Sequence, residues 1–167
     1  MPRVTRVASA GAGARQGRLL HVPVPWMFVL NYLLGAALQY VAPIRVAWEP
    51  PFDMSVAGGA LFVLGVAIAG WGWITFHRAG TTRVPGQTST TLVTWGPYRA
   101  TRNPMYVGLS LAYLGEAGLL RQAWPPLLLP LTLAYLNWVV IPVEESRLRE
   151  VFGAAYDAYR ARVRRWI

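Results

Sequence analysis

Two polar clusters hold the side chains that are most able to do chemistry. The first lies within residues 96–108 and contains Tyr98, Arg99, Arg102, Asn103 and Tyr106. The second is the pair Glu144 and Glu145, about 35 residues further along the chain. Each cluster borders a long apolar segment, and an ionisable group beside a membrane core is costly and often functional. We therefore expect the two clusters to form one site at a membrane face.

Charged side chains at these borders favour binding of a charged ligand. Arginines beside free N–H groups at a helix start can hold a carboxylate. Plainer explanations also exist, because Asn103 and Pro104 are common where a helix begins, and Glu144 and Glu145 suit the first turn of a following helix. Under either explanation we predict an ion pair between one of the glutamates and Arg99 or Arg102.

The composition excludes several classes of protein and of site. Hydrophobic residues make up 54% of the 167 residues and charged residues only 14%, which is too apolar for an ordinary soluble domain. The absence of cysteine excludes disulfides and thiolate chemistry, and two histidines are too few for a histidine metal site. The net charge of +9 comes from arginines beside apolar segments, so we expect anionic membrane lipids and not nucleic acid as its partners.

Apolar segments predict an all-α polytopic membrane protein that positions the two clusters. A helix needs about 20 apolar residues to cross a bilayer. Four segments fit this pattern, at residues 24–41, 54–76, 104–120 and 124–143, within a single membrane domain at 21–167 that follows a basic tail at 1–20. In the second segment, Gly58, Gly65, Ala69 and Gly72 share a helical face, and such a stripe lets another helix approach closely.

The charge of the connecting segments predicts the orientation. The N-terminal tail carries +4, the loop at 77–103 carries +4 and the tail at 144–167 carries +2, whereas the other two connections carry −1 and 0. Positive segments stay in the cytoplasm. We therefore expect both termini and the loop at 77–103 on the cytoplasmic side of the membrane. At the other side, we expect Glu116 to pair with Arg121.

The C-terminal tail predicts an amphipathic helix over residues 144–163. Apolar side chains, among them Leu148, Phe152, Tyr156 and Tyr159, recur at three- and four-residue steps. Gly153 weakens the helix and allows a break there. The tail can serve as an anchor in the headgroup layer, or it can cover a site.

The order of the polar motifs resembles the isoprenylcysteine carboxyl methyltransferase family and the related phospholipid methyltransferases of bacterial membranes. That family has a Gly-x-Tyr-Arg turn, then Arg-His-Pro-x-Tyr-x-Gly, then a Glu-Glu pair and Phe-Gly-x-x-Tyr-x-x-Tyr. The chain matches these motifs at residues 96–99, 102–108, 144–145 and 152–159, with Asn103 in place of the usual histidine. The resemblance covers residues 80–167, about half of the chain.

The resemblance implies a methyltransferase that takes S-adenosylmethionine as cofactor and a lipophilic small molecule or lipid as acceptor. It implies Arg102, Glu144 and Glu145 as catalytic residues and no metal. The cofactor contacts that it implies are Thr90, Thr91, Leu92, Val93, Tyr98, Arg102, Asn103, Pro104, Met105, Tyr106 and Glu144. The carboxylate of the cofactor would suit Arg99 or Arg102, so we count Arg99 among the cofactor contacts.

Two other functions fit the same sequence. The first is a membrane reductase related to sterol reductases, which would bind NADPH phosphates with the arginines of the tail. The second is a membrane scaffold without catalysis. Binding of S-adenosylmethionine or of NADPH would separate the three, because a ligand stabilises the folded protein that it binds.

Overall fold

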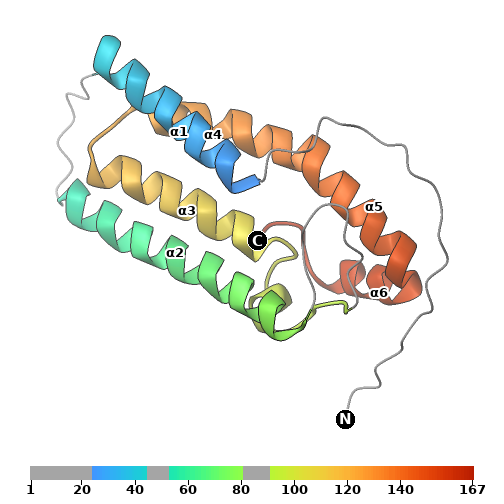
Figure 1. Cartoon of the computed structure of the whole chain (residues 1–167). Helices are drawn as coiled ribbons and strands as arrows, with labels where there is room; N and C mark the ends of the chain where they lie inside the picture. The colour runs from blue at the N-terminus through green and yellow to red at the C-terminus, as the bar shows by residue number, and fades with distance from the viewer. Residues whose placement is uncertain (1–23, 45–52, 81–90) are drawn as a thin grey trace.

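The computed structural model describes residues 24–44, 53–80 and 91–167, and every regular element in these ranges is helical. Four long helices run side by side: α1 (Val24–Val41), α2 (Met54–Arg78), α3 (Pro104–Leu119) and α4 (Trp124–Tyr135), each antiparallel to the next along the chain (Figure 1). The predicted all-α class is therefore confirmed. The basic tail at 1–20 and Thr90 lie outside the described residues.

Three helices are long and apolar enough to span a bilayer among the residues that the structure describes: Val24–Val41, Met54–Arg78 and Trp124–Phe152. The third includes α4 and the two elements that continue it. Helix α3 has 16 residues, or about 24 Å at 1.5 Å per residue, which is shorter than the ~30 Å apolar core of a bilayer. The fourth predicted span, through α3, stays a prediction.

Glycines bring α2 and α3 into backbone contact. A Cβ added to Gly65 of α2 would collide with the backbone of Ala112, and one added to Gly108 of α3 would lie 2.5 Å from the amide nitrogen of Ala69. The predicted small-residue stripe is therefore confirmed, and its partner is α3. This close packing fixes the start of α3 beside the end of α2, where Phe76 lies.

Buried polar side chains join α1 to α3 and α4. The Tyr113 hydroxyl on α3 donates to Asn31 Oδ1 at 2.6 Å, and the Asn31 amide donates to the Leu128 carbonyl at 3.3 Å. The ring of Tyr113 also packs edge-on against Tyr32 and Phe28. Such bonds hold helices together where lipid provides no hydrophobic drive for association.

Helix α4 continues into the polar end of the molecule through a π-helical segment, η2 (Leu136–Val140), and then α5 (Ile141–Phe152). Pro142 explains the π-helical turn. It has no N–H for the carbonyl of Trp138, and its ring crowds that carbonyl. The helix widens, and the Ile141 N–H donates to the Leu136 carbonyl five residues earlier.

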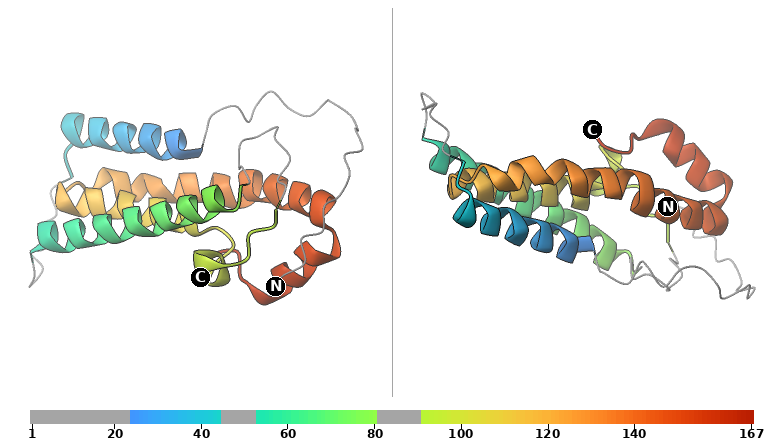
Figure 2. Two further views of the ribbon diagram at one scale, coloured as in Figure 1. Left: turned by 60° about the horizontal axis from the view of Figure 1, so that its bottom comes forward. Right: turned by 90° about the horizontal axis from the view of Figure 1, so that it is seen from above.

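The predicted tail helix over residues 144–163 differs at its start, whereas the break that Gly153 allows is present. Helix α5 is part of the long helix that begins at Trp124, and α6 (Ala154–Arg162) follows after a break at Gly153. Gly153 has φ 49°, a left-handed conformation that glycine adopts without a Cβ clash. After this turn, α6 folds back and the chain ends beside the segment that precedes α3 (Figure 2).

The end of the molecule opposite the tail corrects another expectation. Arg121 does not pair with Glu116; its guanidinium lies 3.4 Å from Asp53 Oδ1 and also donates to Ser55. Asp53 caps α2 by accepting from the Ser55 N–H at 2.8 Å. This backbone bond, with a further contribution from Arg121, lowers the pKa of the Asp53 carboxyl.

Candidate active site

The two polar clusters meet at the end of the molecule where α2 ends and α3 begins (Figure 1). A short 3₁₀ helix, η1 (Gly96–Arg99), turns the chain between them, and Gly96 starts this turn with φ 61°. Pro104 then begins α3, while α5 and α6 bring the glutamates and the tail tyrosines to the same place. Segments far apart in the sequence therefore build one site.

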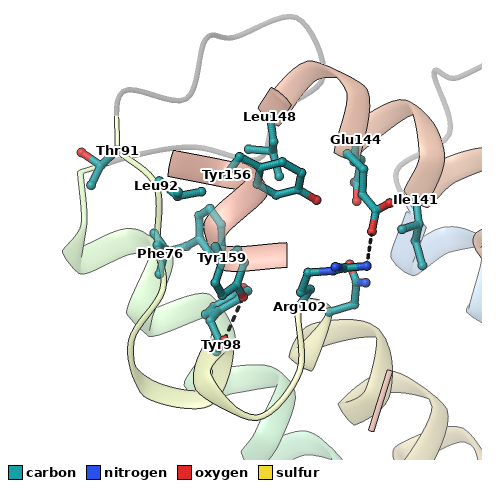
Figure 3. Close-up of a pocket in the computed structure, with 13 residues that line it drawn as sticks. Phe76, Thr91, Leu92, Tyr98, Arg102, Ile141, Glu144, Leu148, Tyr156 and Tyr159 are labelled. Atoms are coloured by element: carbon teal, nitrogen blue, oxygen red, sulfur yellow. Dashed lines mark hydrogen bonds and ion pairs between the residues drawn. The ribbon is translucent and has the colours of Figure 1, made fainter. Parts of the chain in front are cut away.

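The site encloses a cavity of about 30 Å³ (Figure 3). Its lining comes from α2, the segment before α3, α5 and α6: Phe76, Thr91, Leu92, Val93, Tyr98, Arg102, Asn103, Ile141, Glu144, Glu145, Leu148, Tyr156 and Tyr159. This volume holds about two water molecules, whereas sites for small organic ligands enclose roughly 300–1,000 Å³. A ligand of that size requires the lining side chains to move apart.

Glu145 forms the predicted ion pair with Arg102. Arg102 Nη2 lies 2.9 Å from Glu145 Oε1, and the two side chains are only 10% and 12% exposed. Arg165 from the C-terminus lies 2.8 Å from Glu145 Oε2 and donates from Nε to Oε1 at 3.2 Å. Both oxygens of Glu145 are therefore occupied by arginine donors.

Glu144 has a different environment from its neighbour. Its Oε1 accepts from the Tyr106 hydroxyl at 2.7 Å, and its Oε2 is buried with no hydrogen-bond partner among the described residues. Arg102 Nε is likewise buried and unpartnered within the described chain. Since an unmet buried polar atom costs roughly 1–3 kcal/mol, a ligand that satisfies both would gain from each. Two residues that line the cavity therefore carry an unpartnered acceptor and an unpartnered donor.

Two tyrosines of α6 cover the cavity. The Tyr159 hydroxyl donates to the Tyr98 carbonyl at 2.8 Å, which fixes α6 on the turn before α3 (Figure 3). Tyr156 is 2% exposed. Burial, and secondarily the charge of Glu145, raises the pKa of Tyr156, so its hydroxyl keeps its proton at neutral pH. The tail therefore covers the site, as one of its two predicted roles required.

The structure brings most of the predicted site residues together. Those that line the cavity are Thr91, Leu92, Val93, Tyr98, Arg102, Asn103, Glu144 and Glu145, and Tyr106 reaches it through its bond to Glu144. Three others lie elsewhere. Arg99 is exposed on η1, Pro104 is buried at the start of α3, and Met105 points at Gly72 of α2.

Asn103 occupies the predicted position before α3 but does not use its side chain as a cap. Its amide instead donates to the Arg165 carbonyl at 3.0 Å. The side chain therefore holds the C-terminal residues against the start of α3.

Sequence reasoning missed several cavity residues. Phe76 and Ile141 are apolar positions of long helices, and nothing in their spacing separates them from lipid-facing or core residues. Leu148, Tyr156 and Tyr159 were predicted on the apolar face of the tail, and the two tyrosines also belong to the matched motif at 152–159, but none was assigned to the site. The aromatic hydroxyls of the two tyrosines, three residues apart, were the available signal.

Comparison with known proteins identifies the family of the chain. The family profile described as phospholipid methyltransferase matches residues 54–155. The searches of curated proteins and of solved structures gave no match. Because the matched range is more than half of the chain, the protein belongs to the phospholipid methyltransferase family, whose members are membrane methyltransferases that act on lipid.

Proposed function

We propose that the protein transfers a methyl group from S-adenosylmethionine to a lipid or lipophilic acceptor at the cytoplasmic face of a bacterial inner membrane, in the manner of isoprenylcysteine carboxyl methyltransferases. The observation that carries this proposal is that two residues lining the cavity each keep one buried polar atom without a partner among the described residues, Glu144 Oε2 and Arg102 Nε. One such acceptor and one such donor match the ammonium and carboxylate of an amino acid.

These atoms fit the methionine end of the cofactor. Glu144 Oε2 would accept from the ammonium group, and Arg102 Nε would donate to the carboxylate. Charge-assisted bonds of this kind are about twice as strong as neutral ones. Arg102 takes the role that the resemblance divided between Arg99 and Arg102, since Arg99 is exposed and does not line the cavity.

The aromatic lining suits a cationic ligand. Phe76 packs edge-on against Tyr98 with ring centroids 4.9 Å apart, and Tyr156 lines the cavity beside them. Ring faces attract a cation within about 6 Å, and S-adenosylmethionine supplies a methyl group on a positively charged sulfur. The protein's contribution is to orient the reactants and exclude water.

Glu144 is the better candidate for direct contact with ligand, and Glu145 for support. The arginines already occupy both oxygens of Glu145. A general base needs a free oxygen within reach of the proton that it removes. Glu145 lacks such an oxygen, and we therefore assign the contact with the cofactor's ammonium group to Glu144 and a supporting role to Glu145.

The charge distribution supports the cytoplasmic placement. The loop at 77–103 and the tail both carry net positive charge, and the described parts of both lie at the end that holds the site (Figure 1). Basic segments flanking membrane helices remain on the cytoplasmic side. A water-soluble cofactor would reach the cavity from there, and the acceptor from the lipid.

A thermal-shift measurement in detergent with S-adenosylmethionine, S-adenosylhomocysteine and NADPH tests the function. At a ligand concentration of about 100 times Kd, stabilisation reaches about 2.7 kcal/mol. We expect both adenosyl ligands to raise Tm by several degrees and NADPH to leave it unchanged. Stabilisation by NADPH alone would favour the reductase, and no shift with any of the three would favour the scaffold.

A second assay addresses the acceptor. Methyl-labelled S-adenosylmethionine is incubated with the protein and a bacterial lipid extract, and label is counted in the organic phase. We expect lipid labelling with wild type and its loss with Glu144→Ala. Label found only in the aqueous phase would contradict a lipophilic acceptor.

A further inference from the structure

The C-terminal strap, residues 163–166, is pinned to the start of α3 by its main chain. The Arg102 N–H donates to the Arg164 carbonyl at 2.9 Å. The Arg165 carbonyl accepts from Thr101 Oγ1 at 3.1 Å and from the Asn103 amide at 3.0 Å. These bonds hold one residue of the strap, Arg165, with its side chain directed at the glutamates.

The guanidinium of Arg165 joins two parts of the long helix. It bonds both oxygens of Glu145, from Nε at 3.2 Å and from Nη2 at 2.8 Å. Its Nη1 donates to the carbonyl and to the side-chain oxygen of Asn137, both at 3.2 Å. A planar guanidinium makes such forked contacts in a fixed geometry that a lysine cannot reproduce.

Pro142 explains why the Asn137 carbonyl needs an outside donor. In a π-helical turn, this carbonyl would accept from residue 142, which as proline has no N–H. The alternative donor, the Ile141 N–H, is already bonded to the Leu136 carbonyl. Arg165 replaces the missing donor and so stabilises the helix at the point where it turns the glutamates towards the cavity.

The same contact balances the charges of the site. Glu144 and Glu145 carry two negative charges, and Arg102 and Arg165 carry two positive ones. Without Arg165, Arg102 would keep the bond from its Nη1 to the Arg160 carbonyl at 3.1 Å, but its Nη2 could turn towards either oxygen of Glu145. The direction of the unpartnered Arg102 Nε therefore depends on Arg165 through Glu145.

We propose that Arg165 is a positioning residue of the active site: through Glu145 it fixes Arg102 for ligand binding, so that the C-terminal strap is a working part of the site. This inference rests on the proposed function. Arg165 lies beyond residues 54–155, the range that matches the family profile.

The test compares Arg165→Gln with two controls of the same strap. Arg164→Gln removes an equal charge from an exposed side chain that makes no hydrogen bond or ion pair among the described residues. Trp166→Phe removes an anchor of the strap, the indole bond to Asn137 Oδ1 at 3.1 Å, but leaves Glu145 untouched. Arg165→Lys keeps the positive charge but cannot make the forked guanidinium contacts to Glu145 and Asn137. For each variant, Tm and the Kd for S-adenosylhomocysteine are measured in detergent.

A positioning role and a merely structural role give different results. We expect Arg165→Gln to weaken binding at least tenfold, Arg165→Lys to recover part of this loss, and Arg164→Gln to bind like wild type. Trp166→Phe should lower Tm and leave Kd within about twofold. Wild-type affinity in Arg165→Gln, or an equal loss of affinity in Trp166→Phe, would overturn the positioning role.

Failure of the proposed function is distinguishable from failure of this inference. If wild type does not bind S-adenosylhomocysteine, the proposed function and the role of Arg165 are both overturned. If wild type binds and Arg165→Gln binds equally well, the inference alone is overturned. Hydrogen exchange at the Arg102 amide, which bonds the Arg164 carbonyl, provides a reading without ligand. We expect this amide to exchange faster in Arg165→Gln than in Arg164→Gln. Equal exchange in the two variants would contradict the positioning of Arg102 by Arg165.

Discussion

Glu144 and Glu145 are neighbours in sequence with different surroundings. Two arginines occupy Glu145, whereas Glu144 has one tyrosine partner and one buried oxygen without a partner among the described residues. A buried carboxylate with all its bonds made stabilises a structure, and one with an unmet oxygen is suited to a ligand. The paired acids therefore divide into one that supports the site and one that meets the ligand.

The support role predicts a large loss of stability in Glu145→Gln. The substitution leaves two arginines without their charge partner, and breaking a buried pair costs about 3 kcal/mol or more. Asp157→Asn is the matched control, because its pair with Arg149 is about half exposed and is worth at most about 1 kcal/mol. Thermal unfolding in detergent measures both. Equal shifts in Tm would contradict a stabilising role for the buried ion pairs of Glu145.

The proposed contact between Glu144 and the ligand predicts that Tyr106→Phe binds S-adenosylhomocysteine more weakly. This change removes the hydroxyl that orients Glu144 Oε1, a bond to a charged group. Such bonds contribute about 1.5 kcal/mol or more, so Kd for S-adenosylhomocysteine should rise about tenfold. Tyr135→Phe, on the same membrane domain and with no hydrogen bond among the described residues, should bind like wild type. Unchanged affinity in Tyr106→Phe would remove that bond from the site.

The sequence was sufficient to predict the ion pair because charged residues at membrane borders need partners. It could not distinguish Glu144 from Glu145, because their difference arises from Arg165, which is 20 residues away and reaches the site only after the turn at Gly153. Asn103 shows the same limit: its position before α3 was predictable, but its bond to the Arg165 carbonyl depends on the path of the tail.

At the scale of helices, glycine spacing was the most reliable signal. Gly58, Gly65 and Gly72 recur every seven residues, and the structure places α3 against that stripe. The length of the last membrane helix was less predictable. Glu144 and Glu145 suited the first turn of a new helix, but a π-helical turn accommodates Pro142 and the helix continues to Phe152.

Two glycines of α2 predict opposite effects on stability. Gly65→Ala places a methyl group against the backbone of Ala112 and should cost about 1–3 kcal/mol. Gly70→Ala, where nothing lies within 4 Å, should be neutral or stabilise by about 0.5–1 kcal/mol. Thermal unfolding of both variants checks this. A loss in Gly70→Ala as large as in Gly65→Ala would contradict the close packing of α2 on α3.

For the whole molecule, the helices place the site at one end of the bundle. Glu145 and its partners Arg102 and Arg165 lie there, together with α5 and α6. Asp53 and Arg121 pair at the opposite end of the bundle (Figure 1). The sequence predicted this separation through the charge of the loops. It also predicted four spans, and the span through α3 stays a prediction, because α3 is short and packs closely against α2.

The charge distribution predicts the location of the C-terminus. A C-terminal fusion to green fluorescent protein should fluoresce in cells, and a fusion to alkaline phosphatase should be inactive, because the first matures in the cytoplasm and the second requires export. The excess of arginine in the tail and the loop at 77–103 is the physical reason. An active phosphatase fusion with a dark fluorescent fusion would place the site on the opposite face.

Calorimetric titration of the purified protein with S-adenosylhomocysteine tests the central claim most directly. Wild type should bind, Glu144→Ala should lose measurable binding, and Glu150→Ala, an exposed acid on the same helix, should bind like wild type. This result would assign the unpartnered oxygen of Glu144 to the ligand. Equal affinity in wild type and Glu144→Ala, with both proteins folded, would contradict it.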